Sequence, residues 1–219
     1  MSKTIDAMIY RTVDADEPIR QGDIFRNVPH LEFSLARLAI VEDDDQEIRS
    51  WESIVESGET QPVTALIALE PVNAIVITQD CDAARGKHLC LAQIDEFLEV
   101  TGKKSSPPTS PKKWQSLLTA HAKSNLRYFY LPADESFGFV QRMAADFRSI
   151  IRLPREELLD LRQYRMGRLN DVASEHFRES LGQFYRRYPY NEWYPLTKEE
   201  AATYAEASPE EIEFYEWQK

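Results

Sequence analysis

The sequence predicts an α+β fold, on three observations. Short apolar runs rich in β-branched residues, bounded by Pro, Gly and Asp, recur through the first two thirds of the chain and are typical of strands. Apolar residues at helical spacing dominate the last third. The 219 residues are 42% hydrophobic and 29% charged, which is typical of globular proteins that bury a core without disulfide staples. We expect one main domain at residues 1–190 and an acidic helical tail at residues 191–219.

The N-terminal part of the chain predicts short strands and one exposed loop. Residues 21–25 form a turn that leads into a strand, and we expect Pro29 to end that strand. Residues 31–41 fit a second strand or a short helix, and their periodicity does not decide between the two. Residues 42–47 are almost all acidic, so mutual repulsion favours an exposed loop there.

The clearest local signal is a central hairpin. Residues 62–70 and 73–79 are mostly apolar runs separated by Pro71, and both are predicted to be buried strands. Residues 80–86 are rich in turn-forming types, and residues 88–94 return as a strand. The second and third of these strands should therefore pair with each other.

The second half of the chain alternates helices and strands. The predicted elements are a proline-rich linker at residues 102–111, a helix at 112–123, strands at 128–131 and 137–143, a helix from Pro154 to about Tyr164, and a longer helix that Asn170 or Asp171 caps and Pro189 ends. Phe177, Leu181 and Phe184 recur at helical spacing, so we expect them on the inward face of that longer helix. Two capping boxes in the tail predict two short acidic helices.

The charge is strongly acidic overall and unevenly distributed. A net charge of −11 disfavours non-specific binding to nucleic acid or anionic lipid. Residues 101–190 nevertheless carry sixteen basic and nine acidic groups. Two interpretations follow: a locally basic face on an acidic protein, or acidic and basic halves that face each other in the fold.

Several classes of protein are excluded or disfavoured. The chain lacks a G-x-G-x-x-G sequence, a P-loop, an H-E-x-x-H motif and a G-x-S-x-G elbow, so the common nucleotide-dependent enzymes and α/β-hydrolases are disfavoured, and we expect no cofactor. Two cysteines, no apolar leader segment and no apolar run of membrane-spanning length predict a cytoplasmic protein with reduced thiols and no membrane partner.

The best candidate site lies at the mouth of the predicted hairpin. It comprises Thr78, Asp80, Cys81, Asp82 and Arg85. A thiol between two carboxylates at the end of an apolar strand is not what packing alone requires. The two aspartates could equally serve as turn residues, because their side chains accept hydrogen bonds from nearby backbone N–H groups.

A cysteine- or metal-dependent site is a weaker interpretation of the same segment. Cys81, His88 and Cys90 supply three candidate ligands, whereas a zinc site needs about four, so we predict no metal ion. Adjacent carboxylates disfavour a Cys81 thiolate, and a Cys81-dependent hydrolase would also need His88, His121 or His176 beside the thiol. Cys90, between two leucines, is better explained as a core residue.

Ten arginines and no lysine occur between Arg142 and Arg187. The planar guanidinium suits phosphate, but seven acidic residues share the segment, and pairing along helix surfaces is the simpler explanation. The aromatic run at residues 128–130 could stack on unpaired bases, although such a run is more often part of a core.

Four short motifs together resemble the MazF/PemK-type toxins. They are Gly22-Asp23-Ile24 at the first strand, the run from Asn73 to Thr78, the return through residues 92–94, and Gly167 to Asp171 at the start of a helix. The motifs Gly22 to Phe25, Cys81-Asp82, Tyr128 to Pro132 and Leu153-Pro154 are also similar to those of a larger group of bacterial proteins.

The resemblance implies an SH3-like β-barrel with an inserted helix and a helical C-terminal part. It also implies metal-independent endoribonuclease chemistry, in which an arginine before the central strand and a Ser or Thr near the site act on RNA. Thr78 stands at the Ser/Thr position, whereas Pro71-Val72-Asn73 stands where the arginine is expected, and an acidic insertion doubles the spacing before that strand. The sequence therefore leaves ribonuclease activity open.

Two functions follow from these patterns. The first is a MazF/PemK-like bacterial cytosolic protein that recognises single-stranded RNA or a toxin-type partner. The alternative is a non-catalytic module whose acidic surface binds a basic protein partner. A homodimer is an open expectation in either case.

Overall fold

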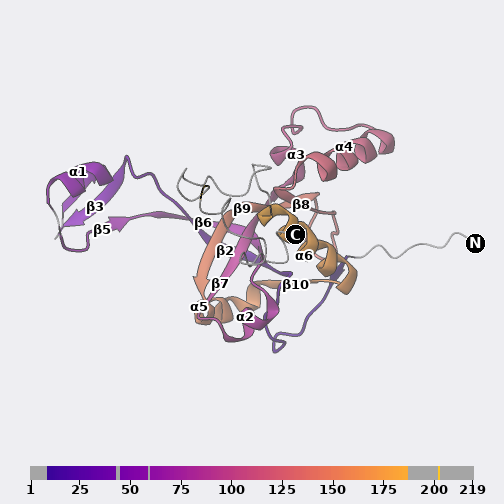
Figure 1. Cartoon of the computed structure of the whole chain (residues 1–219), viewed down its shortest axis with the longest axis horizontal. Coiled ribbons are helices and arrows are strands. Elements are labelled where there is room, and N and C mark those ends of the chain that lie inside the picture. Colours follow the sequence, from indigo (N-terminus) through magenta and orange to yellow (C-terminus); the bar gives the residue numbers. More distant parts are fainter. Residues whose placement is uncertain (1–8, 43–44, 59, 187–201, 203–219) are drawn as a thin grey trace, which may run out of the picture. The chain divides into compact units, whose positions relative to one another are not determined.

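The computed structural model describes residues 9–42, 45–58, 60–186 and 202. The chain divides into two compact units, residues 1–185 and 186–219, and every element below belongs to the first. It is an α+β structure, as predicted, with a curled seven-stranded antiparallel sheet, a smaller three-stranded sheet and several helices (Figure 1). The two helices predicted for the tail lie outside the described residues, apart from Ala202.

All pairings in both sheets are antiparallel. The large sheet has the order β1 (Tyr10–Arg11), β10 (Arg165–Leu169), β2 (Asp23–Glu32), β6 (Ala68–Val76), β7 (His88–Glu96), β9 (Met143–Pro154) and β8 (Tyr128–Leu131). The small sheet has the order β4 (Asp45–Arg49), β3 (Leu38–Glu42) and β5 (Thr64–Leu66). The helices are α1 (Trp51–Glu56), α2 (Asp80–Arg85), α3 (Phe97–Val100), α4 (Pro111–Ser124), α5 (Arg155–Asp160), a 3-10 turn (Leu161–Tyr164) and α6 (Asp171–Tyr185).

The centre of the large sheet is buried on both faces. Side chains alternate along a strand, so Ile75 belongs to one core cluster while its neighbours Ala74 and Val76 belong to another. The first cluster includes Phe177 of α6, and the second includes Leu158 of α5. The two helices thus close opposite faces of the sheet.

The prediction for α6 is confirmed. The Asn170 side-chain oxygen accepts the Ala173 N–H at 2.9 Å, which caps the helix. Phe177 is fully buried, and Leu181 and Phe184 pack against the first core cluster, as the helical spacing predicts.

The central hairpin is also confirmed, with two corrections. Pro71 lies inside strand β6 and does not separate two strands. Strands β6 and β7 pair from Asn73 opposite Ile94 to Val76 opposite Leu91. The segment predicted as a turn is instead the short helix α2. Asp80 and Asp82 occupy its first turn, where negative charge interacts favourably with the helix dipole.

The prediction that Pro29 ends the first strand is wrong. Strand β2 continues through Pro29 to Glu32, and Pro29 stands opposite Pro71 of β6. In the described part of the chain, this stretch of β2 pairs only with β6. Each of the two strands therefore has one edge without a neighbouring strand, and a proline, which has no N–H, can face that edge without loss of a ladder hydrogen bond. The same arrangement explains why residues 68–71 are exposed rather than buried.

Residues 33–58 also differ from expectation. The segment predicted as a strand or a helix, residues 31–41, includes most of strand β3. The acidic block belongs to a β-hairpin in which Glu42 pairs with Asp45 and Ile40 with Glu47. Its acidic side chains are exposed from Asp45 onward, so a hairpin solves the repulsion as well as a loop. The unpredicted helix α1 buries only Ile54, which packs on Leu38 and Ile40.

The second half agrees with prediction except around one strand. Helix α4, strand β8 and the helical stretch from Arg155 to Tyr164 are confirmed. Residues 137–143 do not form a strand: the Asp134 carboxylate accepts the N–H groups of Ser136 and Phe137 in a tight turn. The strand β9 begins only at Met143. Within the described residues, no helix is long and apolar enough to cross a membrane.

Candidate functional site

Thr78 lies just beyond the end of strand β6, and both its hydroxyl group and its backbone N–H form hydrogen bonds with the backbone of β7. Its hydroxyl oxygen accepts the N–H of Cys90 at 2.7 Å, and its own N–H donates to the Cys90 carbonyl at 3.3 Å. These bonds extend the hairpin beyond the last ladder pair. The role the structure gives Thr78 is therefore to join two strands.

Asp80 links three segments that are far apart in the sequence. Its Oδ1 accepts the backbone N–H of Gln21 at 2.9 Å, and its Oδ2 lies 3.4 Å from Nη2 of Arg178 on α6. The Gln21 side chain donates to the Ile77 carbonyl at 2.7 Å and accepts from Nε of Arg178 at 3.2 Å. Asp80 thus fastens α2 to the turn before β2 and to α6.

The other three predicted site residues, Cys81, Asp82 and Arg85, are exposed on α2. Cys90 is half-buried and packs on the first core cluster, as expected of a core residue. In the described segments no hydrogen bond joins Cys81 to a histidine, and no group of three or more His, Cys, Asp or Glu could hold a metal ion.

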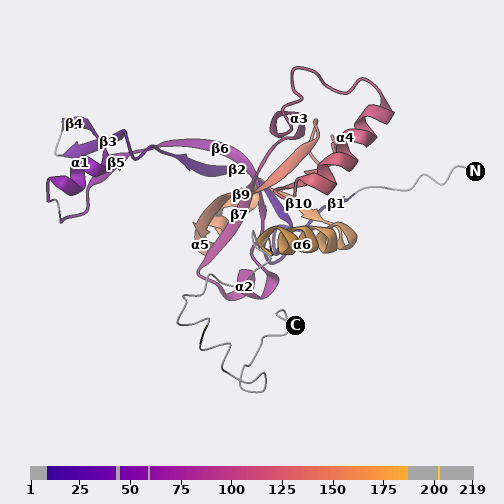
Figure 2. The same ribbon diagram turned by 45° about the horizontal axis from the view of Figure 1, so that its top comes forward.

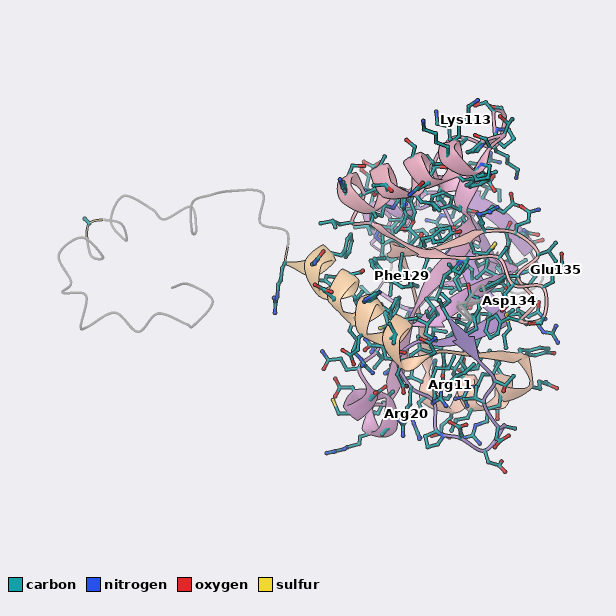
Figure 3. The ribbon with its side chains drawn as sticks, turned by 90° about the vertical axis from the view of Figure 1, so that its right-hand side faces the viewer. Arg11, Arg20, Lys113, Phe129, Asp134 and Glu135 are labelled. Atoms are coloured by element: carbon teal, nitrogen blue, oxygen red, sulfur yellow. The ribbon has the colours of Figure 1, made fainter. Side chains whose placement is uncertain are left out.

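A small charged cleft opens beside Asp80, with a volume of about 130 Å³. We call it the arginine cleft. It is lined by Arg11, Arg20, Gln21, Asp80, Arg168, Asp171, Ser174, Glu175 and Arg178. Figure 3 shows Arg11 and Arg20 near each other, close to the start of α6. Four guanidinium groups and three carboxylates therefore meet around one hollow.

The wall formed by Arg168 is held by a buried ion pair. Arg168 bonds both carboxylate oxygens of Asp23, which is completely buried, and donates to the Pro18 carbonyl at 2.8 Å. Nη2 of Arg165 lies 2.8 Å from the same carboxylate. An unpaired charge at this depth would be costly, so this network fixes the geometry of the cleft.

Glu17 adds a partly exposed carboxylate to the network. Its Oε2 lies 3.2 Å from Nη1 of Arg168 and 3.8 Å from Nη2 of Arg11. Desolvation alone would raise the pKa of Glu17, but the Asp14 N–H and the nearby arginines hold that pKa below its usual value. Glu17 is therefore an anion that occupies Arg168 and approaches Arg11.

The four arginines of the cleft differ in their availability. Arg168 is occupied by Asp23, and Arg178 by Asp80, Gln21 and Glu175. Arg20 is exposed, and its guanidinium has no polar partner in the described part of the chain. Arg20 is the arginine best able to bind an anion that enters the cleft.

A larger groove, of about 950 Å³, lies between α4, β8 and α6. Phe129, His121 and His176 are among the residues that line it, so two histidines proposed as partners of Cys81 lie along this groove instead. His121 is buried, its Nε2 has no partner among the described residues, and burial lowers the pKa of its ring.

Sequence reasoning located Asp80 and noted the arginine-rich stretch that contains Arg168 and Arg178, but it did not place any arginine of the cleft beside Asp80. Arg11 and Arg168 are partners in the pairing of β1 with β10, and neither strand was predicted. The signal that pointed to this region was the turn at Gln21, Gly22 and Asp23. No protein-family model and no curated protein matches this chain.

Proposed function

We propose that this protein binds single-stranded RNA through the arginine cleft, on a fold of the MazF/PemK-like SH3-barrel type. The observation that carries the proposal is Arg20, an exposed guanidinium without a polar partner among the described residues, in a cleft that also contains the predicted site residue Asp80. Guanidinium groups bind phosphate oxygens in a two-pronged, charge-assisted geometry.

The fold supports the proposal at a coarse level. A curled antiparallel sheet closed by a C-terminal helix is the architecture that the resemblance implies. Two of the motifs that carry the resemblance, at Gly22 and Gly167, stand at left-handed backbone positions with φ of 87° and 154°. Gly22 immediately precedes β2, and Gly167 lies within β10, next to Arg168 of the cleft.

The distribution of charge removes the main objection, which is the net charge of −11. Residues 31–70 carry ten acidic and two basic groups, and residues 191–219 carry eight acidic and two basic groups. The remainder of the chain has 22 basic and 19 acidic groups, a net charge of +3. The part of the protein that holds the cleft therefore does not repel a polyanion.

The size of the cleft fits contact with one phosphate at a time. A hollow of about 130 Å³ admits one phosphate group and its sugar oxygens. We propose recognition and assign no cleavage step, because the Thr78 hydroxyl is already bonded to the Cys90 N–H.

The test is binding of a short fluorescein-labelled single-stranded RNA, measured by anisotropy over a range of salt concentrations. Arg20→Ala should weaken binding about tenfold, as loss of a charge-assisted contact does, and reduce the salt slope by about 0.7. Arg152→Ala removes another exposed arginine, outside the cleft, and is the matched control. Equal losses in the two variants, or no binding by the parent protein, would refute the proposal.

A further inference from the structure

Among the described residues, exposed apolar side chains are concentrated in residues 28–72. We call this segment the arm. It contains the ends of β2 and β6 that pair only with each other in the described chain, and they lead into the small sheet with α1 (Figures 1 and 2). Among the described residues, nine of the thirteen large hydrophobic side chains that are exposed belong to the arm. Exposed apolar surface concentrated in this way is characteristic of a binding surface.

The first part of this surface is the open face of the small sheet. Leu38 and Ile40 face α1 and pack on Ile54. Because side chains alternate along a strand, Ala39 points to the opposite face, together with its cross-strand partners Ile48 and Leu66. The side chains of Ile48 and Leu66 are 56% and 60% exposed. This row is an apolar strip that no described residue buries.

The second part is one face of the two-stranded ribbon. Leu31 and Leu69 are paired directly across β2 and β6, and their side chains are 54% and 61% exposed. The Pro29–Pro71 pair lies two residues further along the same face. The other face carries His30 opposite Glu70. The ribbon is therefore amphipathic, with an apolar face that is not buried.

The charge of the arm specifies the chemistry of its partner. The arm sequence contains ten acidic residues and only two arginines, Arg37 and Arg49. Glu32 and Glu70 are exposed on the ribbon face opposite Leu31 and Leu69, and Glu47 is exposed on the α1 side of the small sheet, opposite Ile48 and Leu66. The apolar strips therefore belong to a strongly acidic segment, whose electrostatic field attracts a positively charged partner. A partner must supply apolar side chains for the strips and positive charge that matches the acidic arm.

We propose that the arm is a docking surface for a basic polypeptide segment whose lysines or arginines alternate with apolar side chains. A second copy of the arm is the wrong occupant, because a two-fold contact between arms would bring two strongly acidic surfaces together. This inference is independent of RNA binding, since the arm contributes no residue to the arginine cleft.

The first experiment tests the apolar strips with a synthetic peptide in which lysine and leucine alternate, added to the full chain. The double variant Leu31→Ser with Leu69→Ser should weaken binding of this peptide about tenfold or more, as removal of central interface contacts does. Val140→Ser is the matched control, because Val140 is 73% exposed and lies outside the arm. A peptide of alternating lysine and serine should bind the parent chain much more weakly.

The second experiment tests the acidic charge of the arm with the same lysine–leucine peptide. Glu70→Lys should weaken binding and flatten its dependence on salt, whereas Glu135→Lys, an exposed acid outside the arm, should leave both nearly unchanged. Thermal unfolding of each variant establishes that it remains folded, and this is expected because all the substituted side chains are exposed.

Three results would overturn the proposal. The parent chain could fail to bind the lysine–leucine peptide, or the arm variants could bind it as tightly as Val140→Ser and Glu135→Lys do. Alternatively, sedimentation velocity could show a dimer of the full chain that dissociates in the Leu31→Ser, Leu69→Ser variant, which would make a second copy the occupant. Loss of peptide binding confined to the arm variants would support the proposal.

Discussion

Strands β2 and β6 each have two ends with opposite environments, and the contrast shows what an apolar pattern can and cannot predict. At one end, Ile24 and Phe25 are both fully buried, because helices cover both faces of the large sheet. At the other end, in the arm, Leu31 and Leu69 are more than half exposed. Both ends have similar β-branched and apolar residues. Burial is decided by what covers the strand, which is not a local property.

The largest test of this contrast uses the two acidic residues at the ends of β2. Asp23→Ala removes the buried carboxylate that Arg165 and Arg168 share and should cost about 3–5 kcal/mol of unfolding free energy. Glu32→Ala, at the exposed arm end, should change stability by less than about 0.5 kcal/mol. Urea denaturation of both variants makes the measurement. Similar losses would show that the arm end of β2 is as tightly held as its other end.

The second test uses two aliphatic residues of β6. Ile75→Ala removes a fully buried side chain from the first core cluster and should cost about 2–5 kcal/mol. Leu69→Ala removes a side chain that is 61% exposed, and the expected cost is below about 1 kcal/mol. A large loss at Leu69, seen in the same urea experiment, would contradict the open surface on which the docking proposal depends.

The third test compares two short helices: α2, which follows strand β6 of the large sheet, and α1, which belongs to the arm. Asp82 lies in the first turn of α2 and Glu52 in the first turn of α1, and both are exposed. Replacement of either by alanine removes a favourable interaction with the helix dipole and should cost about 0.3–1 kcal/mol. Asp82→Asn should lose the same dipole interaction.

The RNA measurement separates function from stability at Asp82. The arginine cleft does not include this residue, so RNA binding by Asp82→Asn should match that of the parent chain. Abolished RNA binding in this variant, with stability unchanged, would move the functional site from the cleft to the exposed face of α2.

What the sequence could predict follows from how local each signal is. Helix α6 carries its cap at Asn170 and its core face at Phe177 within a few turns, so periodicity was sufficient. Strands β9 and β10 were missed because arginines interrupt their apolar residues. Arg168 fits in β10 only because Asp23, 145 residues earlier, neutralises it. Such long-range compensation has no local sequence signature.

The candidate site shows the same limit. Asp80 was identified because it ends an apolar strand, which is a local feature. Its partners Gln21 and Arg178 lie 59 and 98 residues away, and Arg20 enters the cleft only because the turn before β2 packs on α2. A single sequence contains no measure of these distances, so the arginine cleft required the structure.

The smallest expected effect concerns pH and the buried histidine of α4. Burial lowers the pKa of His121 below its usual value near 6.5, so the folded protein favours the neutral ring. The unfolded chain then binds more protons as the pH falls below about 6.5, and the stability that the neutral ring provides is lost as the pH falls through the lowered pKa. His121→Phe keeps a ring against Phe97, which His121 contacts edge to face at 4.9 Å between centroids. The urea-unfolding free energies of parent and variant should run parallel above pH 7 and diverge below pH 6.5, with the parent losing more. Parallel curves down to pH 5 would mean that His121 is protonated as readily in the folded protein as in the unfolded chain, and that the groove beside α4 is open to water at that ring.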